Sequence, residues 1–558
     1  MAKLWSGWIR VVLAALSGLL AGYAALAVAE LVSAAVRPQA SPVVAVGGAA
    51  IDRTPPAVKD WAIRHFGTND KLVLQLGILA VLALFAMLLG VVALRYRRIG
   101  AAGVLLFGGV GALAATSRPD STGAADAVPS IVGTVVAAAL LFWLIGRLQT
   151  HRSPHRAVGE PDAADRRVPS AGSNATVDEP EPPSAGGAAG EGWDRRGFVV
   201  AATAAAAAST GAGWLGLSLN GSSGQSAVAS RSKVVLPRPA SPAAPVPKGA
   251  ELRIPGISPF FTPNADFYRV DTALVVPKVD ATTWRLTIHG KGVSRPRTVT
   301  FDDLIHGRAG ELIERDVTLA CVSNEVGGPY IGNARWIGVR LTDLLREAGV
   351  QPPSKGGPAD QLVARSVDGM TIGSPVEDVM DGRDAMLAVG MNGQPLPFEH
   401  GFPVRMLVPG LFGYVSACKW IEDLELTTFD AYDSYWVKRS WARRGPIKTE
   451  SRIDTPKPFA RPAKGTVMVA GVAWAQHRGI DRVEIRVDDG PWQPADLAAQ
   501  DTTDTWCQWS FPWKATTSGS HTLTVRATDR TGTVQTEKRT PTIPDGASGW
   551  HSVVVTVQ

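Results

Sequence analysis

Long apolar runs dominate the first 220 residues of this 558-residue chain. A helix needs about 20 mostly apolar residues to cross the hydrocarbon of a bilayer. Five runs reach or approach that length, at residues 8–36, 72–94, 99–115, 128–145 and 198–219, although the third is short and rich in glycine. The pattern predicts an α-helical transmembrane bundle of four helices over 1–147 and a fifth transmembrane segment over 195–220.

Basic residues between the runs predict how the helices are oriented. Arginines are dense at residues 95–98 ("RYRR") and at both ends of the stretch from 148 to 194. Because short segments rich in Lys and Arg stay in the cytoplasm, these segments and the N-terminus should be cytoplasmic. Everything after about residue 220 should then lie outside the membrane. The prediction is a multi-pass protein of the cell membrane with extracytoplasmic domains.

Two stretches have the composition of linkers. Residues 148–194 are rich in Ala, Gly, Pro, Asp and Glu, which predicts a disordered cytoplasmic linker. Residues 221–250 are rich in Ser, Ala and Pro and predict a tether. Between them, Arg195, Arg196 and Phe198 resemble a twin-arginine export signal, and the alternative is a pair of basic residues that anchors a helix end.

The apolar runs carry no side chains suited to transport or haem binding. No charged residue falls at mid-depth of a run, and no histidine falls in one. A proton or ion pathway, or a haem held by two histidines, would need such residues. The first four helices are therefore interpreted as an anchor or a docking bundle, and a transporter is the weaker alternative.

The rest of the chain has the patterns of soluble domains. Residues 283–290 ("TWRLTIHG") alternate apolar and polar side chains as a strand does. Residues 300–307 ("TFDDLIHG") offer a Thr N-cap for a short helix, and 340–350 ("RLTDLLREAGV") predict an amphipathic helix that a glycine ends. These segments predict an α+β domain over 251–445. The short alternating segments of 456–558, broken by Asp-Gly, Ser-Gly and Thr-Gly, are typical of an immunoglobulin-like β-sandwich.

Charge and cysteine content exclude several classes of partner and site. The net charge is +6, but the Lys and Arg residues flank apolar runs and form no basic block with interleaved aromatics, so no nucleic-acid partner is expected. The three cysteines, Cys321, Cys418 and Cys507, are too few and too scattered for a disulfide framework or a CxxC metal site. Cys418 and Cys507 are expected to be buried as small apolar side chains.

Candidate chemistry gathers in two places. His400, Arg405, Ser416 and Lys419 lie within twenty residues, with three glycines between them that let a ligand approach the backbone. Basic side chains beside exposed amides suit a phosphorylated ligand, and a polar loop without a ligand is the alternative. Cys321 follows the apolar strand "DVTLA" and precedes a Gly-rich turn. A cysteine there serves as a nucleophile or as a metal ligand, and spacing alone does not choose between them.

Several separated segments, taken in order, resemble the sulfite oxidase family of molybdopterin-dependent oxidoreductases. They are "FYRVDTALVVP", "CVSN" with "ARWIGVRLTDLL", "MNGQPLPFEHGFPVRMLVPGLFGYVSACKW" and "YDSYW", and with the β-sandwich they cover about 255–558. The resemblance implies a sulfite-oxidase-type molybdopterin domain over 251–445 and a Mo-molybdopterin cofactor. It also implies a dimerisation domain over 456–558, which allows a homodimer.

The resemblance assigns roles to nine positions. It implies that Cys321 is the thiolate ligand of molybdenum and is catalytic together with Arg269. The implied cofactor-binding residues are Tyr268, Arg269, Cys321, Asn324, Ser366, His400, Arg405, Ser416 and Lys419. Trp336 matches a position near the metal pocket.

Two departures from the family pattern bear on the substrate. Glu325 and Val326 stand where sulfite oxidases carry arginines that bind the anion, and Trp441 stands where they carry a tyrosine. An acidic side chain beside the pocket would repel sulfite, so sulfite is an unfavourable substrate unless positive charge comes from elsewhere. The arginines that are candidates for supplying it are Arg335, Arg439, Arg443 and Arg444.

The predicted function is that of a membrane-anchored, extracytoplasmic molybdenum oxidoreductase. It would transfer an oxygen atom and two electrons to or from a small-molecule substrate and exchange electrons with a separate, unidentified partner. A reductase of oxidised small molecules or protein sulfoxides competes with a sulfite oxidase proper. The alternative from another class is a metal-free membrane scaffold with a degenerate molybdopterin fold.

Overall fold

The computed structural model describes residues 2–55, 58, 65–66, 70–118, 121, 123–149 and 195–558. The chain divides into two compact units. The first comprises Met1–Gly47, Pro56–Thr116 and Gly123–Leu217, and the second comprises Gly48–Pro55, Ser117–Thr122 and Ser218–Gln558. The disordered linker predicted over 148–194 lies outside the described residues, apart from its first two.

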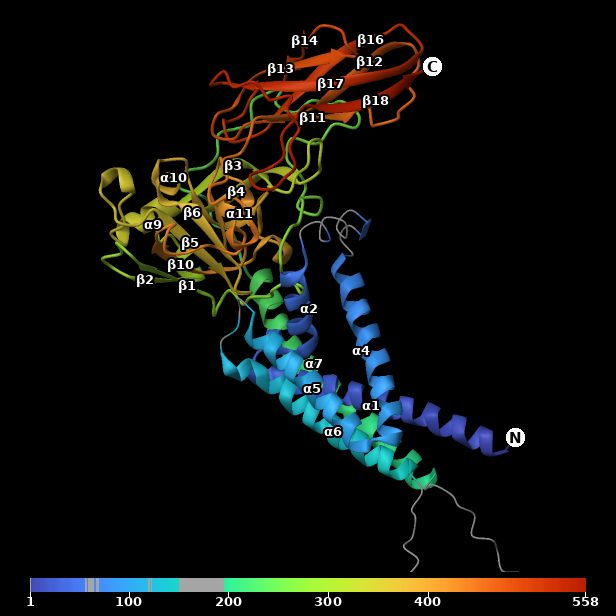
Figure 1. The fold of residues 1–558 in the computed structure, drawn as a ribbon. Helices are drawn as coiled ribbons and strands as arrows, with labels where there is room; N and C mark the ends of the chain where they lie inside the picture. Colours follow the sequence, from blue (N-terminus) through green and yellow to red (C-terminus); the bar gives the residue numbers. More distant parts are fainter. Residues whose placement is uncertain are drawn as a thin grey trace, which may run out of the picture. The chain divides into compact units, whose positions relative to one another are not determined.

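Helices make up the first unit (Figure 1). Its long helices are α1 (Ala2–Val36), α4 (Asp70–Arg95), α5 (Arg97–Thr116), α6 (Val128–Leu148) and the first part of α7 (Arg195–Ser232). The sequence patterns missed the short helices η1 (Pro38–Ala40), α2 (Pro42–Arg53) and η3 (Ala124–Ala127). Helix α1 packs against α4 and α6, and α5 packs against α6.

Glycines set how closely these helices approach one another. A Cβ at Gly18 of α1 would overlap the backbone oxygen of Ala86 in α4, and one at Gly133 of α6 would overlap that of Ala25 in α1. Lipid gives helices no hydrophobic reason to associate, so close backbone contact between small residues is a main source of packing energy in a membrane. These contacts fit helices that pack in lipid.

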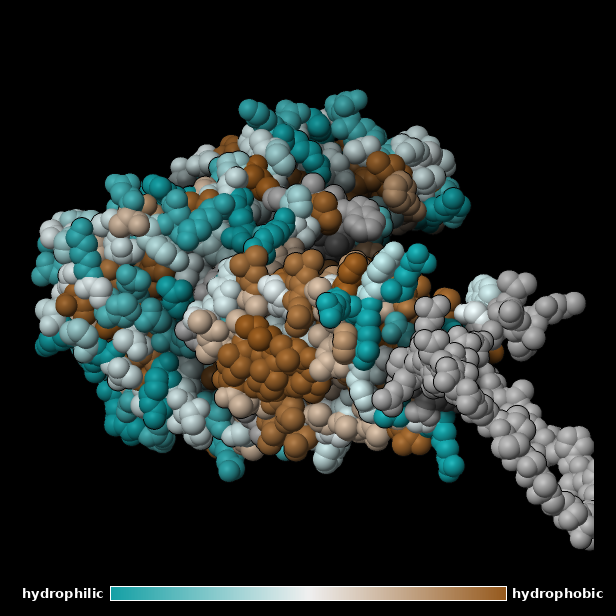
Figure 2. All heavy atoms as spheres, turned by 60° about the horizontal axis from the view of Figure 1, so that its bottom comes forward, coloured by the Kyte–Doolittle hydropathy of each residue, from teal (hydrophilic) through white to brown (hydrophobic). Residues whose placement is uncertain are grey.

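Five helices are long and apolar enough to cross a membrane, judged by length and composition. They are Gly7–Val36, Lys71–Arg95, Arg97–Thr116, Ala124–Leu148 and Arg196–Ser232. Large apolar side chains such as Leu76, Leu106 and Leu113 remain exposed on them. Figure 2 shows apolar side chains gathered over the helices. Each of these helices contains one of the five predicted runs.

The fifth helix is longer than predicted. Helix α7 continues to Ser232, so the prediction that a tether begins at residue 221 is wrong. Residues 221–232 contain no proline, and extending an existing helix is far easier than starting one. The segment that follows is docked as well, because Ala240 N donates to Leu312 O at 2.9 Å.

Two five-stranded sheets form the core of the α+β part (Figure 1). The first sheet has, in spatial order, β2 (Arg297–Thr300), β1 (Arg285–Gly290), β10 (Ile421–Thr427), β5 (Gln361–Ser366) and β6 (Thr371–Pro375). The second has β3 (Leu312–Ala320), β4 (Ile331–Arg340), β7 (Met386–Met391) and β8 (Gln394–Pro395), with β9 (Arg405–Leu407) paired to β7. Only β1 and β10 pair in parallel among these described strands. The helices of this part are α8 (Phe301–Ile305), α9 (Leu341–Glu347), η4 (Pro353–Lys355), α10 (Val376–Met380), η5 (Phe398–His400), α11 (Gly413–Ser416) and η6 (Val437–Arg439).

Three local predictions for this part are confirmed. Strand β1 (Arg285–Gly290) covers all but the first two residues of the alternating stretch. Thr300 caps α8, because its side chain accepts from Asp303 N at 3.0 Å while the Asp303 carboxylate accepts from Thr300 N at 3.0 Å. Helix α9 ends shortly before Gly349, whose φ of +85° is the left-handed conformation that terminates helices.

The C-terminal part is a β-sandwich of two four-stranded sheets. One sheet has the order β11 (Glu450–Thr455), β12 (Gly465–Trp474), β16 (Cys507–Ala515) and β15 (Asp496–Leu497), and the other has β14 (Gln493–Pro494), β13 (Ile480–Val487), β17 (Gly519–Asp529) and β18 (His551–Val557). Val483, Trp509 and Val525 are fully buried in its core. The predicted sandwich is confirmed, but it begins at Glu450 rather than at 456, because β11 is one of its edge strands.

Candidate functional site

Five of the predicted cofactor-binding residues line one pocket of the second unit. They are Tyr268, Cys321, His400, Arg405 and Lys419. Tyr268 precedes β1, Cys321 follows β3, Arg405 begins β9 and Lys419 precedes β10. The pocket therefore draws on both sheets and exists only when the whole domain is folded.

The loop that presents Cys321 is tied together by its own hydrogen bonds. Cys321 N donates to Tyr330 O at 2.9 Å, and Tyr330 N donates to the side-chain oxygen of Asn324 at 2.8 Å. Ser323 N donates to Cys321 Sγ at 3.4 Å, a contact that favours the thiolate. Asn324 does not line the pocket, so in this structure it shapes the loop around the thiol.

The C-terminal sandwich holds the strand that carries Cys321. Strand β3 lies at the edge of its sheet, where backbone groups need other partners. Thr318 N donates to Asp504 O at 2.9 Å, and Thr318 O accepts from Gln476 Nε2 at 3.0 Å. Trp506 N donates to Thr318 Oγ1 at 2.8 Å. The sandwich thus supplies hydrogen-bond partners to the edge of β3 at Thr318, three residues before the cysteine.

A second set of contacts from the sandwich holds the loop after Cys321. Arg452 Nη1 of β11 donates to Gly328 O at 2.7 Å. His551 of β18 packs so closely on Gly327 that a Cβ there would overlap the imidazole ring. Gly327 also has a φ of +78°, so backbone conformation and space both require glycine. Two domains together fix the position of the thiol.

Arg405 is a buried cation without a carboxylate partner among the described residues. Its Nη1 donates to His400 O at 3.2 Å, its guanidinium lies 5.1 Å from the centre of the Trp336 ring, and its buried Nε has no hydrogen-bond partner among those residues. Burial lowers the pKa of Arg405 to about 10. Because a buried charge is costly unless an opposite charge accompanies it, this arrangement suits an anionic ligand.

His400 is a neutral neighbour of that cation. Burial, followed by repulsion from Arg405, lowers the pKa of His400 to about 4. Its Nε2 lies 3.0 Å from Asn264 O, and because a carbonyl only accepts, Nε2 carries the proton. Nδ1 is then the ring nitrogen that can accept a hydrogen bond.

Asp271 joins two predicted residues that lie apart in the sequence. Its carboxylate, 1% exposed, accepts from Lys419 Nζ at 2.8 Å and from Arg269 Nε at 2.9 Å. Lys419 Nζ also donates to Glu399 O at 3.2 Å. Asp271 lines the pocket and was missed in the sequence, although it stands two residues after Arg269. Arg269 itself does not line the pocket and reaches it through this carboxylate.

The structure does not bring every predicted residue to the pocket wall. Ser416 Oγ lies 3.0 Å from the backbone oxygens of Leu411 and Phe412, where it supports the turn of α11. Ser366 ends β5 and is buried, with its Oγ 3.5 Å from Asp368 N. Their predicted contacts with a cofactor remain predictions, as do those of Asn324 and Arg269.

Aromatic side chains form a part of the wall, of which the resemblance had singled out only Trp441. Tyr414, Trp436 and Trp441 line the pocket, with ring centres 5.8 Å apart for Tyr414 and Trp441 and 6.3 Å apart for Trp436 and Trp441. Tyr414 OH donates to Ala442 O at 2.8 Å and so points away from the pocket as a donor. Burial raises the pKa of Tyr268 above its ordinary value, so its phenol keeps its proton. The wall is mostly apolar and presents few free donors.

The charged side chains that the sequence placed near the substrate do not line the pocket. Glu325 is exposed and does not line the pocket, so the expectation that it lies beside the pocket is wrong. Its neighbour Val326 is buried, and this turns the acidic side chain to solvent. The four candidate arginines, Arg335, Arg439, Arg443 and Arg444, do not line the pocket either. Cys418 and Cys507 are buried and free, as expected.

Comparison with known proteins assigns both parts of the second unit. Residues 273–436 match the oxidoreductase molybdopterin binding domain, and residues 450–525 match the bacterial Ig domain. These matches make the second unit similar to the sulfite oxidase family of molybdopterin oxidoreductases. This identifies the α+β part as the molybdopterin domain and the sandwich as an Ig domain.

The relatives match about half of this chain. Mitochondrial sulfite oxidase of Mus musculus is 31% identical over an alignment 279 positions long, which covers 43% of this chain and 50% of that protein. NADH nitrate reductase 1 of Oryza sativa subsp. japonica is 29% identical over an alignment 338 positions long, which covers 50% of this chain and 36% of that protein. The solved sulfane dehydrogenase SoxCD from Paracoccus pantotrophus is 25% identical with a TM-score of 0.45, covering 54% of this chain and 84% of that chain. The chain spans about half the length of the sulfite oxidases it matches.

The molybdopterin domain and the sulfite oxidase relatives imply Mo-molybdopterin as the cofactor. The residues present fit it, because Cys321 offers a thiol for the metal and Arg405 has a buried Nε without a partner among the described residues, which suits an anionic group. No cluster of three His, Cys, Asp or Glu side chains able to hold a metal occurs in the described part of the chain. A single protein thiolate is compatible with this cofactor, because the pterin brings sulfur ligands of its own.

Proposed function

We propose that this protein is a membrane-anchored molybdenum oxidoreductase that performs two-electron oxygen-atom transfer on a small molecule outside the cytoplasm. The observation that carries the proposal is the pocket that unites Cys321 with the buried, unpaired cation of Arg405. A degenerate, metal-free scaffold would have no reason to keep a buried charge, because such a charge destabilises a fold unless a ligand compensates it.

The residues of the pocket divide the work of holding the cofactor. Cys321 would ligate molybdenum as a thiolate, helped by the Ser323 amide that donates to Sγ. Arg405 and Lys419 would bind the cofactor phosphate, with Asp271 keeping Lys419 in place. The neutral Nδ1 of His400 can accept a hydrogen bond from the pterin. When bound, the cofactor supplies the redox chemistry, and the protein binds and orients.

The walls of the pocket favour an uncharged substrate. Among the described wall residues, Lys419 is already neutralised by Asp271, and Arg405 faces the place proposed for the cofactor anion. The remaining wall includes Trp436 and Trp441, which offer stacking surface but no positive charge. We therefore favour a reductase of a neutral oxidised molecule, such as a sulfoxide, over a sulfite oxidase proper.

Molybdenum content is the direct test of the proposed function. The full-length protein, made in a host that synthesises the cofactor, should contain about one Mo per chain by elemental analysis. Cys321→Ala should abolish this content, whereas Cys507→Ala, a buried free cysteine of the Ig domain, should keep it. A wild-type protein without molybdenum would support the scaffold instead. A substrate screen with artificial electron donors and acceptors then gives the direction of the reaction.

The location and partners are also part of the proposal. The five apolar helices support a multi-pass membrane protein, and the arginines at residues 95–98 support a cytoplasmic side for the loop between α4 and α5. The molybdopterin and Ig domains would then be extracytoplasmic and exchange electrons with a separate redox partner. Labelling of single introduced cysteines in intact cells, at residue 98 and at residue 457, should modify only the second. The Ig domain also remains available for a homodimer, which sedimentation analysis can detect.

A further inference from the structure

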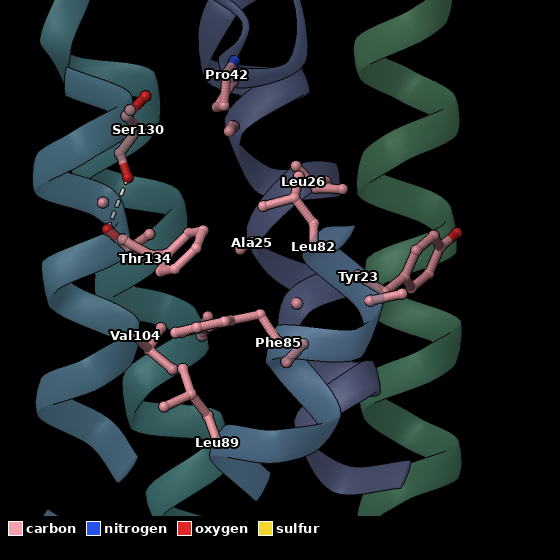
Figure 3. A pocket seen from close by; sticks show the side chains of 18 of the residues that line it. Tyr23, Ala25, Leu26, Pro42, Leu82, Phe85, Leu89, Val104, Ser130 and Thr134 are labelled. Atoms are coloured by element: carbon pink, nitrogen blue, oxygen red, sulfur yellow. Dashed lines mark hydrogen bonds between the residues drawn. The ribbon is translucent and has the colours of Figure 1, made fainter. Parts of the chain in front are cut away.

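The helices of the first unit border a cavity that is partly open to the outside. It lies between α1, α4, α5 and α6, and its wall is almost entirely apolar (Figure 3). Leu26, Leu82, Phe85 and Leu89 are typical of the wall, and none of the described residues that line it is an Asp, Glu, Lys, Arg or His. On α1 the wall runs from Gly18 to Ala29, a length of about 17 Å along the helix. A cavity of this length and character suits a hydrocarbon chain.

The cavity does not result from loose packing of the helices around it. Glycines already bring these helices close together. A Cβ at Gly18 of α1 would overlap the backbone of α4, one at Gly133 of α6 would overlap the backbone of α1, and one at Gly108 of α5 would overlap the Thr134 side chain of α6. The helices cannot close the space by approaching one another more closely at these points. Apolar side chains fill ordinary protein interiors at high density, so a space of this kind requires an occupant or stays empty at a cost.

One polar group of the wall has no partner. Tyr23 OH donates to Thr210 Oγ1 at 3.2 Å, and Thr134 Oγ1 donates to Ser130 O at 2.7 Å. Figure 3 shows Ser130 and Thr134 on one side of the cavity and Tyr23 on the other. The Ser130 hydroxyl is buried, with the residue 2% exposed, and has no hydrogen-bond partner among the described residues. An unpaired hydroxyl in an apolar environment is costly and needs an acceptor or donor.

We propose that this cavity binds one neutral lipid-like molecule. Its acyl or prenyl chain would lie between α1, α4 and α5, and its uncharged head would accept a hydrogen bond from Ser130 Oγ. The absence of charged wall residues excludes an anionic or cationic head from this site. Ser130 lies in the first turn of α6, where a head near the surface of the bilayer would be found. The inference rests on the proposed membrane location and is independent of molybdenum.

The test is the lipid content of the full-length protein. After purification in detergent and extensive exchange, organic extracts analysed by mass spectrometry should contain about one lipid per chain. Ala83→Phe on α4 places a ring in the cavity and should lower that content at least tenfold. Ala80→Phe, the same change three residues away on an exposed position of α4 outside the cavity wall, should leave it unchanged. Ser130→Ala should lower retention about threefold to tenfold, as expected for one hydrogen bond.

The mass of the extracted molecule distinguishes its two sources. An isoprenoid quinone and an uncharged acyl glycerolipid both carry a long chain and a carbonyl acceptor, and either one supports the proposal. Detergent alone, no retained molecule, or equal amounts in Ala83→Phe and Ala80→Phe would overturn it. Molybdenum content measured on the same samples separates this outcome from failure of the proposed function, because Ala83→Phe should not change it.

Discussion

The contact between Arg452 of the Ig domain and the cysteine loop is open to a direct test. Arg452 is 9% exposed and donates three hydrogen bonds, to Asp454 Oδ1 at 2.7 Å, to Gly328 O at 2.7 Å and to Ser258 Oγ at 3.0 Å. Arg452→Met keeps the unbranched apolar part of the side chain but removes all three donors. Removing one partner of a buried ion pair costs about 3–5 kcal/mol. We expect the lower end, because Ser258 N still donates to Asp454 Oδ2 at 3.0 Å.

A second variant separates overall stability from the position of the thiol. The double variant Arg452→Met/Asp454→Leu removes both charges, and replacing a buried pair by apolar groups is often neutral. Its thermal stability should therefore return towards that of the wild type. Gly328 O still lacks its donor in the double variant. The loop around Cys321 should therefore stay loosened by about 1 kcal/mol, the net worth of one hydrogen bond.

Alkylation of Cys321 in cofactor-free protein reads out this loosening without any enzymatic activity. The thiol is only 9% exposed, so iodoacetamide reaches it when the loop opens. Peptide mass spectrometry should show alkylation of Cys321 about five- to tenfold faster in both variants than in the wild type. Cys418, fully buried, serves as an internal control and should not change. If Cys321 in the double variant reacts at the wild-type rate, the Ig domain does not position the thiol through Arg452, and the reasoning is refuted.

Three further variants test the buried charges and the aromatic wall. Burial raises the pKa of Glu450 to about 8 from an ordinary value of 4.5, so the folded state binds this proton more tightly than the unfolded state. Protonation of Glu450 therefore stabilises the fold fully below about pH 4.5. As the pH rises towards 8 this contribution is lost, and the free energy of unfolding falls by up to about 4–5 kcal/mol. Glu450→Gln should flatten this decline in thermal unfolding curves between pH 5 and pH 8, and an unchanged slope would contradict the assignment. Arg405→Met should reduce the molybdenum content at least tenfold. The cofactor-free variant should melt no lower than the cofactor-free wild type, because the buried Arg405 charge is costly without the cofactor anion. A strongly destabilised cofactor-free variant would indicate a structural role. Trp441→Tyr adds a phenol to the wall, which can donate one new hydrogen bond to a charged substrate. The ratio of kcat/KM for an oxyanion such as sulfite to kcat/KM for a neutral sulfoxide should therefore rise about tenfold. An unchanged ratio would place Trp441 away from the substrate.

Local patterns in the sequence were sufficient where local forces decide the structure. Thr300 and Asp303 form a capping box within four residues, and Gly349 ends α9 through its own backbone conformation. The alternation of the C-terminal segments predicted the Ig domain because period-two burial is a property of each strand. The end of α7 was misjudged for the converse reason. Serine and glycine after residue 220 favour a linker by composition, but an existing helix extends through them at low cost until the prolines beyond Ser232.

The pocket was only partly predictable because its remaining parts are long-range. Asp271 pairs with Lys419 across 148 positions, and no motif links the two. Glu325 stands only four residues after Cys321, which suggested that it lies beside the pocket. The burial of Val326 turns the Glu325 side chain outward instead. Of the aromatic wall, the resemblance singled out Trp441, but it assigned no role to Tyr414 or Trp436, whose large apolar side chains are equally typical of a core.

The role of the Ig domain follows from the position of β3 in its sheet. Cys321 has to be presented at the end of a strand, and β3 lies at the edge, where one row of backbone groups lacks a partner strand. Asp504 and Gln476 of the Ig domain form hydrogen bonds with the backbone of Thr318 in that row, and Arg452 donates one to the backbone oxygen of Gly328 in the loop. A domain that served only for dimerisation would not need to bond with this strand. The Ig domain is therefore a structural part of the site that holds the thiol, and its loss should disturb the site before it affects any assembly.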